Sequence, residues 1–313
     1  MNAPATTLVL TRDLLTGAEW SAARVRELYH LASDVKARPE KYRSALTGRF
    51  LAMIFEKPSL RTRVTFDVGI QSLGGSAVFL DQGGKRLGER EAIKDVARNL
   101  ERWVQGIVAR TFEQRAVEEL AQHAAIPVIN ALSDRFHPCQ ALADFFTLKE
   151  HFAALRGLKL AYVGDGNNVC HSLLVTGARV GAHVRAATPA GYQPDPEILA
   201  EAQRVAVETG GKIELFPAAE DALAGAQAVY TDVWASMGQE HEAAKRAAIF
   251  APYQVNEALM ELAAPGAVFL HCLPAHRGEE VTDAVIDSPR SIVYDQAENR
   301  LHVQKAILLM LLS

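Results

Sequence analysis

Cysteine is scarce in this chain: there are three among 313 residues, an odd number. Cys139, Cys170 and Cys272 show no paired spacing of the kind that marks a disulfide framework or a structural zinc site. A disulfide-stapled secreted fold is therefore not expected, and a reducing compartment, the cytoplasm, is the predicted location. We also expect no metal, because no second pair of ligands accompanies His271 and Cys272.

Long apolar runs and an excess of basic residues are absent as well. No stretch reaches the roughly 18 consecutive apolar residues of a membrane span, and the N-terminal residues do not read as a signal peptide. The 33 Lys and Arg residues are outnumbered by 37 Asp and Glu, which gives a net charge of −4. Neither a membrane nor a nucleic acid is therefore expected as a partner, whereas a small anion held by a few arginines fits this balance.

What the chain does contain is a regular alternation of apolar runs and helical patterns, with 49% hydrophobic residues. The length predicts about two domains. Strands are predicted near residues 50–55, 76–80, 106–110, 126–132, 159–163, 182–187, 212–216, 228–233, 267–271 and 291–295. Helical patterns lie between them, among them 93–104, about 138–152 and about 297–312.

Such alternation predicts parallel sheets that are covered by helices on both faces. We therefore expect an α/β fold with two doubly wound parallel-sheet domains, residues 1–149 and 150–313. The C-terminal helix, about 297–312, is expected to pack back on the first domain. Ligands of such folds bind beyond the carboxyl ends of the strands, so the active site is expected in the cleft between the two domains.

Residues 55–63, with the sequence FEKPSLRTR, join the first predicted strand to a predicted helix. Ser59 is predicted to cap the N-terminus of that helix. Free backbone N–H groups and the positive end of the helix dipole make such a terminus an anion site. Arg61 and Arg63 in the first turn oppose the dipole, so helix stability does not account for them. A bound phosphate accounts for them, and a solvated arginine-rich surface is the alternative.

Further polar clusters follow other predicted strands. They are Arg110, residues 134–140 (DRFHPCQ), residues 164–168 (GDGNN), residues 232–238 (DVWASMG) and residues 271–277 (HCLPAHR). Any one of them could serve solubility alone. Because the carboxyl ends of parallel strands meet at one edge of a sheet, we expect the clusters to converge on one site.

Four of these motifs carry a resemblance: SLRTR at 59–63, HPCQ at 137–140, DVWASMG at 232–238 and HCLP at 271–274. In this order they resemble the aspartate/ornithine carbamoyltransferase family, and within it the ornithine carbamoyltransferases. The resemblance runs from Phe55 to the C-terminal helix. It implies a homotrimer with active sites shared between subunits, and a reaction that uses no cofactor. The first domain would bind carbamoyl phosphate and the second would bind L-ornithine.

The resemblance also implies roles for individual residues. Carbamoyl phosphate would be bound by Ser59, Leu60, Arg61, Thr62, Arg86, Arg110, His137, Pro138, Cys139, Gln140, Cys272, Leu273 and Arg300. Ornithine would be bound by Asn168, Asp232, Ser236 and Met237, and the catalytic candidates are Arg61, Arg110, His137 and Cys272. Two positions depart from the family pattern. Leu60 replaces the usual Thr or Met, and Arg86 replaces a glutamine that often reaches into a neighbouring subunit.

The chemistry of the implied reaction fits these residue types. Attack of an amine on carbamoyl phosphate places negative charge on the carbonyl oxygen. Hydrogen-bond donors for it can come from Arg61, Thr62, Arg110 and His137. The departing phosphate can take the proton of the amine, so no protein base is required. Cys272 would help to orient or deprotonate the amine. Asp232 offers an anion for the α-ammonium of ornithine, and the same carboxylate would repel an aspartate acceptor.

Three other interpretations stay open at this point. Gly164-Asp165-Gly166 after a strand suggests a dinucleotide-binding oxidoreductase, although Val169 stands where the third glycine of that motif belongs. A relative of the family without catalytic activity is the second alternative. Within the family, an N-acylated ornithine or putrescine could be the acceptor.

Overall fold

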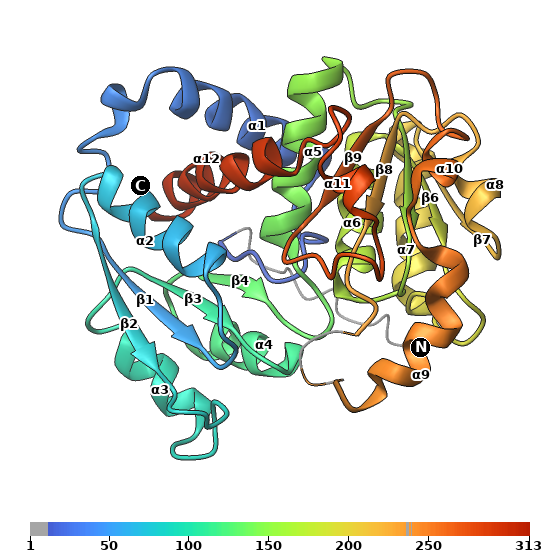
Figure 1. Cartoon of the computed structure of the whole chain (residues 1–313). Coiled ribbons are helices and arrows are strands. Elements are labelled where there is room, and N and C mark those ends of the chain that lie inside the picture. Colours follow the sequence, from blue (N-terminus) through green and yellow to red (C-terminus); the bar gives the residue numbers. More distant parts are fainter. Residues whose placement is uncertain (1–11, 236–237, 239) are drawn as a thin grey trace, which may run out of the picture.

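The computed structural model describes residues 12–235, 238 and 240–313, which build two separate sheets with helices around them (Figure 1). The first sheet has four strands in the order β2-β1-β3-β4, and the second has five in the order β7-β6-β5-β8-β9. All pairings between these strands are parallel. The predicted fold class, an α/β protein with two parallel sheets, is confirmed.

The elements alternate along the chain as the sequence predicted. The strands are β1 (Phe50–Phe55), β2 (Ser76–Asp81), β3 (Gly106–Arg110), β4 (Val128–Leu132), β5 (Lys159–Val163), β6 (His183–Ala187), β7 (Lys212–Phe216), β8 (Ala228–Thr231) and β9 (Val268–His271). The helices are α1 (Ala22–Ala37), α2 (Arg61–Ser72), α3 (Ile93–Leu100), α4 (Gln114–His123), α5 (Pro138–Phe152), α6 (Asn168–Val180), α7 (Pro196–Thr209), α8 (Ala219–Leu223), α9 (Ala243–Phe250), α10 (Glu257–Met260), α11 (Asp283–Ile286) and α12 (Val293–Leu312). None of the helices in this described part of the chain is long and apolar enough to cross a membrane.

The central strands of the first sheet are apolar at nearly every position because helices cover both faces. Side chains of a strand point alternately to its two faces. In β1, Leu51, Met53 and Phe55 join the core that includes residues of α2 and α12, whereas Ala52 and Ile54 join the core of α3 and α4. Figure 1 shows α3 and α4 on the side of this sheet opposite α2 and α12. A continuous apolar run is the sequence signature of such a strand.

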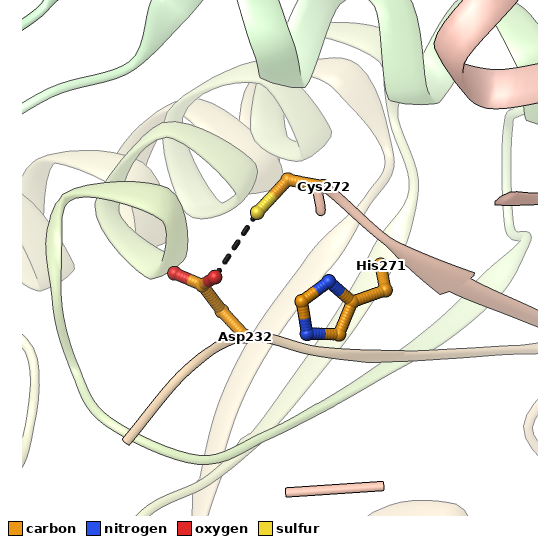
Figure 2. Close-up of side chains that lie close together, drawn as sticks. All are labelled: Asp232, His271 and Cys272. Carbon is orange, nitrogen blue, oxygen red and sulfur yellow. Dashed lines mark hydrogen bonds between the residues drawn. The ribbon is translucent and has the colours of Figure 1, made fainter. Parts of the chain in front are cut away.

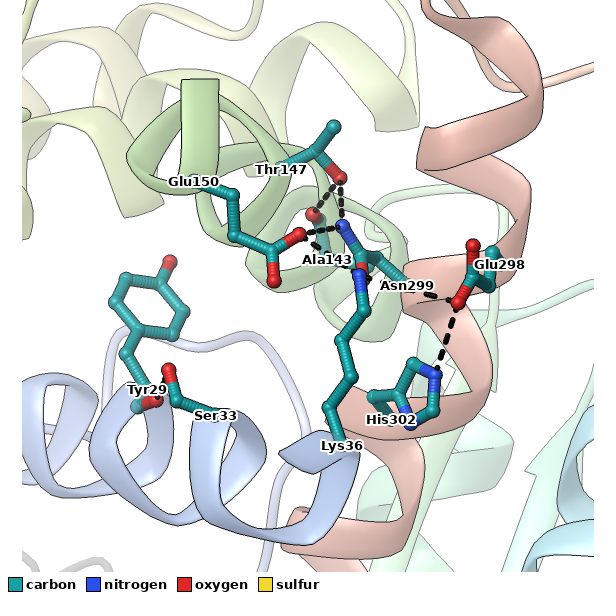
Figure 3. Close-up of polar contacts among 9 residues, drawn as sticks. All are labelled: Tyr29, Ser33, Lys36, Ala143, Thr147, Glu150, Glu298, Asn299 and His302. Carbon is teal, nitrogen blue, oxygen red and sulfur yellow. Dashed lines mark hydrogen bonds and ion pairs between the residues drawn. The ribbon is translucent and has the colours of Figure 1, made fainter. Parts of the chain in front are cut away.

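Helix α12 follows the second sheet in sequence but packs against α1, α2 and α5 (Figure 1). A polar network at the α1–α5–α12 junction ties these helices together (Figure 3). Lys36 Nζ in α1 donates to Glu150 Oε2 in α5 at 3.0 Å and to Asn299 Oδ1 in α12 at 2.8 Å. Asn299 Nδ2 donates in turn to Thr147 Oγ1 at 3.1 Å. These bonds fix the part of α12 that carries Arg300.

The strand predicted at 291–295 is wrong. Ser291 makes an isolated bridge with Phe269, and α12 begins two residues later, at Val293. A short apolar run such as Ile292-Val293-Tyr294 cannot be assigned to a strand or a helix by its pattern alone. The buried residues that follow recur at helical spacing and decide the outcome.

The predicted capping role of Ser59 is also wrong. Leu60 occupies the N-cap position of α2 with an already helical backbone, and no side chain among the described residues caps the helix. The loop before it is held from the other side by Glu56. Its carboxylate accepts hydrogen bonds from the backbone N–H groups of Leu87, at 2.5 Å, and Phe112, at 2.7 Å. Within the described part of the chain, the first N–H groups of α2 have no side-chain acceptor, which suits an anion site.

Two buried helical glycines, Gly177 in α6 and Gly69 in α2, test how tightly their helices pack against neighbouring elements. A Cβ atom on Gly177 in α6 would lie 2.4 Å from Val184 Cγ2, whereas one on Gly69 in α2 would lie 3.5 Å from Lys305 Cγ. We expect Gly177→Ala to lower the free energy of unfolding by about 1–3 kcal/mol, because overpacking strains the contact of α6 with β6. Gly69→Ala is the matched control and should be neutral or stabilising by up to about 1 kcal/mol. Urea unfolding at equal protein concentration measures both, and equal effects of the two substitutions would contradict the described packing.

Candidate active site

A cavity of about 420 Å³ opens where the carboxyl ends of strands from both sheets converge. Its wall includes residues at the carboxyl ends of β1, β3 and β4 in the first sheet and of β8 and β9 in the second. The predicted site residues in its wall are Ser59, Leu60, Arg61, Thr62, Arg110, His137, Gln140, Asn168, Asp232, Cys272, Leu273 and Arg300. The sequence thus predicted most of the polar wall, and the binding roles of these residues remain predictions.

Other predicted residues lie elsewhere. Pro138 and Cys139 do not line the cavity, and the Cys139 thiol donates to the backbone oxygen of Asn130 at 3.4 Å. Residues 137 and 140 share one face of a helical turn, so 138 and 139 turn away from it. Arg86 also lies outside the cavity and forms an ion pair with Glu113 at 3.0 Å. Ser236 and Met237 lie outside the described residues.

The wall contributed by the first sheet and α12 is strongly cationic. Arg110 and Arg300 are buried, with 7% and 3% of their surface exposed. The hydroxyl of Thr62 accepts from Arg300 Nη2 at 2.6 Å and from Arg110 Nη1 at 3.4 Å, so one side chain of α2 joins the two guanidinium groups. The Nε atoms of both arginines have no hydrogen-bond partner among the described residues. Buried charges of one sign are costly unless a counter-ion accompanies them, so this wall suits an anion.

His137 lies beside these arginines and is buried. Burial holds its pKa well below the usual value, and the positive charges of Arg300 and Arg110 lower it further. The imidazole is therefore neutral at pH 7, with one nitrogen that donates and one that accepts. Its Nδ1 atom has no hydrogen-bond partner in the described part of the chain. A neutral ring of this kind can donate to a carbonyl oxygen without acting as a base.

The wall contributed by the second sheet carries one carboxylate, Asp232, and Figure 2 shows its contact with Cys272. The Cys272 thiol donates to Asp232 Oδ1 at 3.0 Å, and Asn167 Nδ2 donates to Asp232 Oδ2 at 2.9 Å. Burial, assisted by the Asp232 carboxylate, raises the pKa of Cys272 well above its usual value. Cys272 is therefore a thiol at neutral pH. It can orient a ligand, but it is not a base that could deprotonate an amine.

The side chains of Asp232, His271 and Cys272 lie close enough together to suggest a metal site (Figure 2). Both ring nitrogens of His271 are engaged, however. The backbone N–H of Leu273 donates to Nδ1 at 2.8 Å, and Nε2 is 3.1 Å from Glu280 Oε1, to which it donates. With the histidine used in this way and the thiol protonated, the cluster offers a structural network rather than a set of free ligands.

Two polar residues of the wall, Lys57 and His276, lie in segments that the sequence marked as polar clusters but were given no role of their own. Lys57 is 6% exposed, and its Nζ lies 4.5 Å from the centre of the Phe112 ring. Burial lowers the pKa of Lys57 to about 8, and the charge of Arg110 acts in the same direction. The available signal for Lys57 was its place inside FEKPSLRTR, just before the turn that is predicted to bind an anion. Its burial, which gives it significance, is not visible in the sequence.

Comparison with known proteins assigns both halves of the chain. Residues 12–150 match the family described as "Aspartate/ornithine carbamoyltransferase, carbamoyl-P binding domain", and residues 156–311 match "Aspartate/ornithine carbamoyltransferase, Asp/Orn binding domain". The chain is 52% identical to "Ornithine carbamoyltransferase" of Anoxybacillus flavithermus over 315 residues, which cover 100% of both chains. It is 50% identical to "Ornithine carbamoyltransferase, anabolic" of Pyrococcus furiosus over 96% of each chain.

Solved structures give the same result. The ornithine carbamoyltransferase of Pyrococcus furiosus superposes with a TM-score of 0.93 at 50% identity, covering 96% of this chain and 97% of that one. The crystal structure of ornithine carbamoyltransferase from Thermus thermophilus gives a TM-score of 0.88 at 50% identity, with 97% and 100% covered.

The lowered pKa of Lys57 predicts how anion affinity depends on pH. A bound dianion stabilises the charged amine, so a proton is taken up on binding above pH 8 and affinity falls as the pH rises, by up to about tenfold per unit. Between pH 7.5 and 9.5 inorganic phosphate is mostly dianionic and makes a suitable probe for calorimetry. Lys57→Arg should bind phosphate with little pH dependence because a guanidinium stays charged, and Lys57→Met should bind it weakly at every pH. A slope that is equally steep in all three proteins would exclude Lys57 as its source.

Proposed function

The chain belongs to the aspartate/ornithine carbamoyltransferase family, and we propose that it transfers the carbamoyl group of carbamoyl phosphate to the δ-amine of L-ornithine. The products are L-citrulline and phosphate. One observation carries the proposal: a single cavity combines Arg61, Arg110 and Arg300 on one wall with Asp232 on the other. An anionic carbamoyl donor and a cationic amino-acid acceptor complement these two walls.

Residues 1–149 are proposed to bind carbamoyl phosphate. Its phosphate would accept hydrogen bonds from the uncapped N-terminus of α2 and from Arg61, at the end of the helix where the dipole is positive. The carbamoyl group would lie against Arg110, His137 and Gln140. Arg300 completes this wall from α12, and its contact with Thr62 supports that placement.

Residues 150–313 are proposed to bind L-ornithine. The Asp232 carboxylate would pair with the α-ammonium, and Asn168 at the start of α6 would face the α-carboxylate. The family resemblance implies that Ser236 and Met237, which lie outside the described residues, also take part in binding. The δ-amine, with a pKa of about 10.4 in water, is mostly protonated at neutral pH, so the site must take its rare neutral form. Since a cationic wall faces the reacting end, the neutral amine is the form that is not repelled.

The reaction then follows from these groups. The neutral δ-amine attacks the carbonyl carbon, the new C–N bond forms, and negative charge develops on the carbonyl oxygen. Arg61, Arg110 and the neutral His137 stabilise that charge as preorganised donors. The bond from carbon to the bridging oxygen breaks, its electron pair leaves with the phosphate, and a phosphate oxygen takes the proton of the amine. No protein base takes part, which agrees with the protonated state of Cys272.

The dinucleotide alternative is not favoured. Gly166 is required by its own surroundings, since its N–H donates to the Tyr192 oxygen at 2.8 Å and an added Cβ would lie 2.2 Å from the nitrogen of Pro194. The close approach that a pyrophosphate would need is thus taken by protein backbone. An N-acylated ornithine would lose the charge that Asp232 is proposed to recognise, and putrescine would leave Asn168 without a carboxylate. The intact set of Arg61, Arg110 and His137 does not suggest a non-catalytic relative.

We also propose a homotrimer whose subunits share active sites. Leu60, Val64 and Val68 form an exposed apolar stripe on α2, with 74%, 49% and 46% of their surface exposed, and Val78 on the edge strand β2 is 48% exposed. Exposed apolar residues that lie together in this way suggest a protein–protein interface. Arg86 lies outside the cavity of its own subunit, so it is the proposed contact with a neighbouring one.

A cytoplasmic location is proposed because all three cysteines are free thiols. The word "anabolic" in one relative's name supports a biosynthetic role.

Citrulline formation measured with ornithine, N-acetylornithine and putrescine side by side tests the proposed function. We expect efficient turnover with ornithine alone. Arg61→Ala is the control for contaminating activity and should lose a factor of about 10²–10³ in turnover, because Arg61 is proposed to serve both the phosphate and the oxyanion. Preference for another amine, or wild-type turnover by a folded Arg61→Ala protein, would contradict the assignment.

Asp232→Asn tests the acceptor side. The substitution keeps the shape of the side chain and removes the charge that is proposed to pair with the α-ammonium. We expect kcat/KM for ornithine to fall by a factor of about 30–150, equivalent to roughly 2–3 kcal/mol, while the KM for carbamoyl phosphate changes little. Steady-state kinetics with each substrate varied in turn measures both. Unaltered ornithine kinetics would mean that the acceptor is recognised elsewhere.

A further inference from the structure

A buried chain of hydrogen bonds connects the cavity wall to the end of β9. Gln140 Nε2 donates to Asp144 Oδ1 at 2.7 Å, and Gln296 Nε2 donates to the same oxygen at 2.7 Å. Gln296 Oε1 accepts from the backbone N–H of His271 at 3.0 Å. All four residues are at most 1% exposed. Only Gln140 and the residue after His271, Cys272, reach the cavity, so Asp144 and Gln296 lie behind its wall.

The polarity of this chain is fixed by its chemistry at one end. The N–H of His271 can only donate, so the amide oxygen of Gln296 must face it and the amide nitrogen must face Asp144. Asp144 Oδ1 accepts that bond, and because an ionised carboxylate oxygen can only accept, it accepts from Gln140 as well. The NH₂ group of Gln140 is held against Asp144. Its remaining polar atom, Oε1, has no partner among the described residues.

We propose that Asp144 is a positioning residue that orients the amide of Gln140 and thereby makes the enzyme select a donor with a carbamoyl NH₂ group. The inference rests on the proposed function, because it concerns the donor of that reaction. With Oε1 as the free atom, Gln140 can accept a hydrogen bond but cannot offer one in the same direction. A carbamoyl NH₂ supplies the missing donor. Acetyl phosphate has the same shape and charge as carbamoyl phosphate. Its methyl group cannot donate a hydrogen bond, so it would leave Oε1 of Gln140 buried and unpaired.

The orientation does not depend on the charge of Asp144. Burial raises the pKa of this carboxyl group to about 7, so both forms are present near neutral pH. Oδ1 receives the amide NH₂ groups of Gln140 and Gln296 at the same time, so a proton on Asp144 would reside on Oδ2. An amide oxygen can replace Oδ1 for the same reason. Asp144→Asn therefore keeps the arrangement, whereas an apolar side chain removes it.

The experiment compares two constants in the citrulline assay: the KM for carbamoyl phosphate and the competitive inhibition constant of acetyl phosphate. Inorganic phosphate, also as a competitive inhibitor, reports the phosphate contacts alone. The preference is the inhibition constant of acetyl phosphate divided by the KM for carbamoyl phosphate. In the wild type we expect this ratio to be about ten or more. Asp144→Leu has a similar volume and no acceptor, so its preference should fall toward one while inhibition by inorganic phosphate stays within about twofold. Asp144→Asn should retain the wild-type preference within about threefold.

Gln296→Leu controls for disturbed packing between α5 and α12. Assayed above pH 8, where Asp144 is mostly ionised and can only accept, it leaves the contact between Gln140 and Asp144 in place and should keep the preference. Should Asp144→Leu not fold, Asp144→Ala provides the same comparison with a smaller side chain. A wild-type preference in the folded Leu or Ala variant would overturn the proposal. So would a parallel loss of inorganic phosphate binding, which would indicate a general distortion of the site. A wild type that forms no citrulline would instead refute the proposed function itself.

Discussion

The cavity is built around positive charges that the protein itself does not neutralise. Arg61, Arg110, Arg300 and Lys57 share one wall, and none of them forms an ion pair within the described part of the chain. Burial lowers the pKa of each of them, and this shows that their charges are costly where they stand. An anionic substrate offsets that cost. The same wall later stabilises the charge that develops on the carbonyl oxygen, so binding and catalysis use one arrangement of donors.

The rest of the fold holds these charges together against their mutual repulsion. Two parallel sheets bring their carboxyl ends to one cleft, and α12 crosses from the second sheet to the first to deliver Arg300. Thr62 bridges the two buried guanidinium groups of this wall, while the contacts of Lys36 and Asn299 fix α12 beside α5. Asp144 belongs to the same scheme, since it joins the wall on α5 to α12 and, through Gln296, to β9. Polar contacts between helices thus position the site, while apolar contacts form the cores behind it.

The sequence predicted the sheets and the polar clusters at the strand ends for a simple physical reason, whereas Arg300 on α12 was implied only by the family resemblance. Doubly buried strands are continuous apolar runs, and polar residues just beyond them meet at one edge of a parallel sheet. Prediction from the sequence was wrong where a local pattern fits two structures, and it was silent where the role of a residue depends on its burial. The segment 291–295 has the composition of a strand, yet the helical spacing of later buried residues makes it the start of α12. Ser59 has the chemistry of a cap but stands one residue too early. Lys57 and Asp144 matter only because they are buried, which no motif reveals.

The claim that the cluster of cations requires an anion is tested most directly by measuring the free energy of unfolding with increasing inorganic phosphate. Sodium chloride at equal ionic strength is the control. A ligand that binds only the folded state should raise this free energy by about 2.7 kcal/mol at a hundred times its Kd, and the gain should be much smaller for Arg300→Met. Stability that is the same in phosphate and in chloride would contradict the account, because the buried charges would then need no anion.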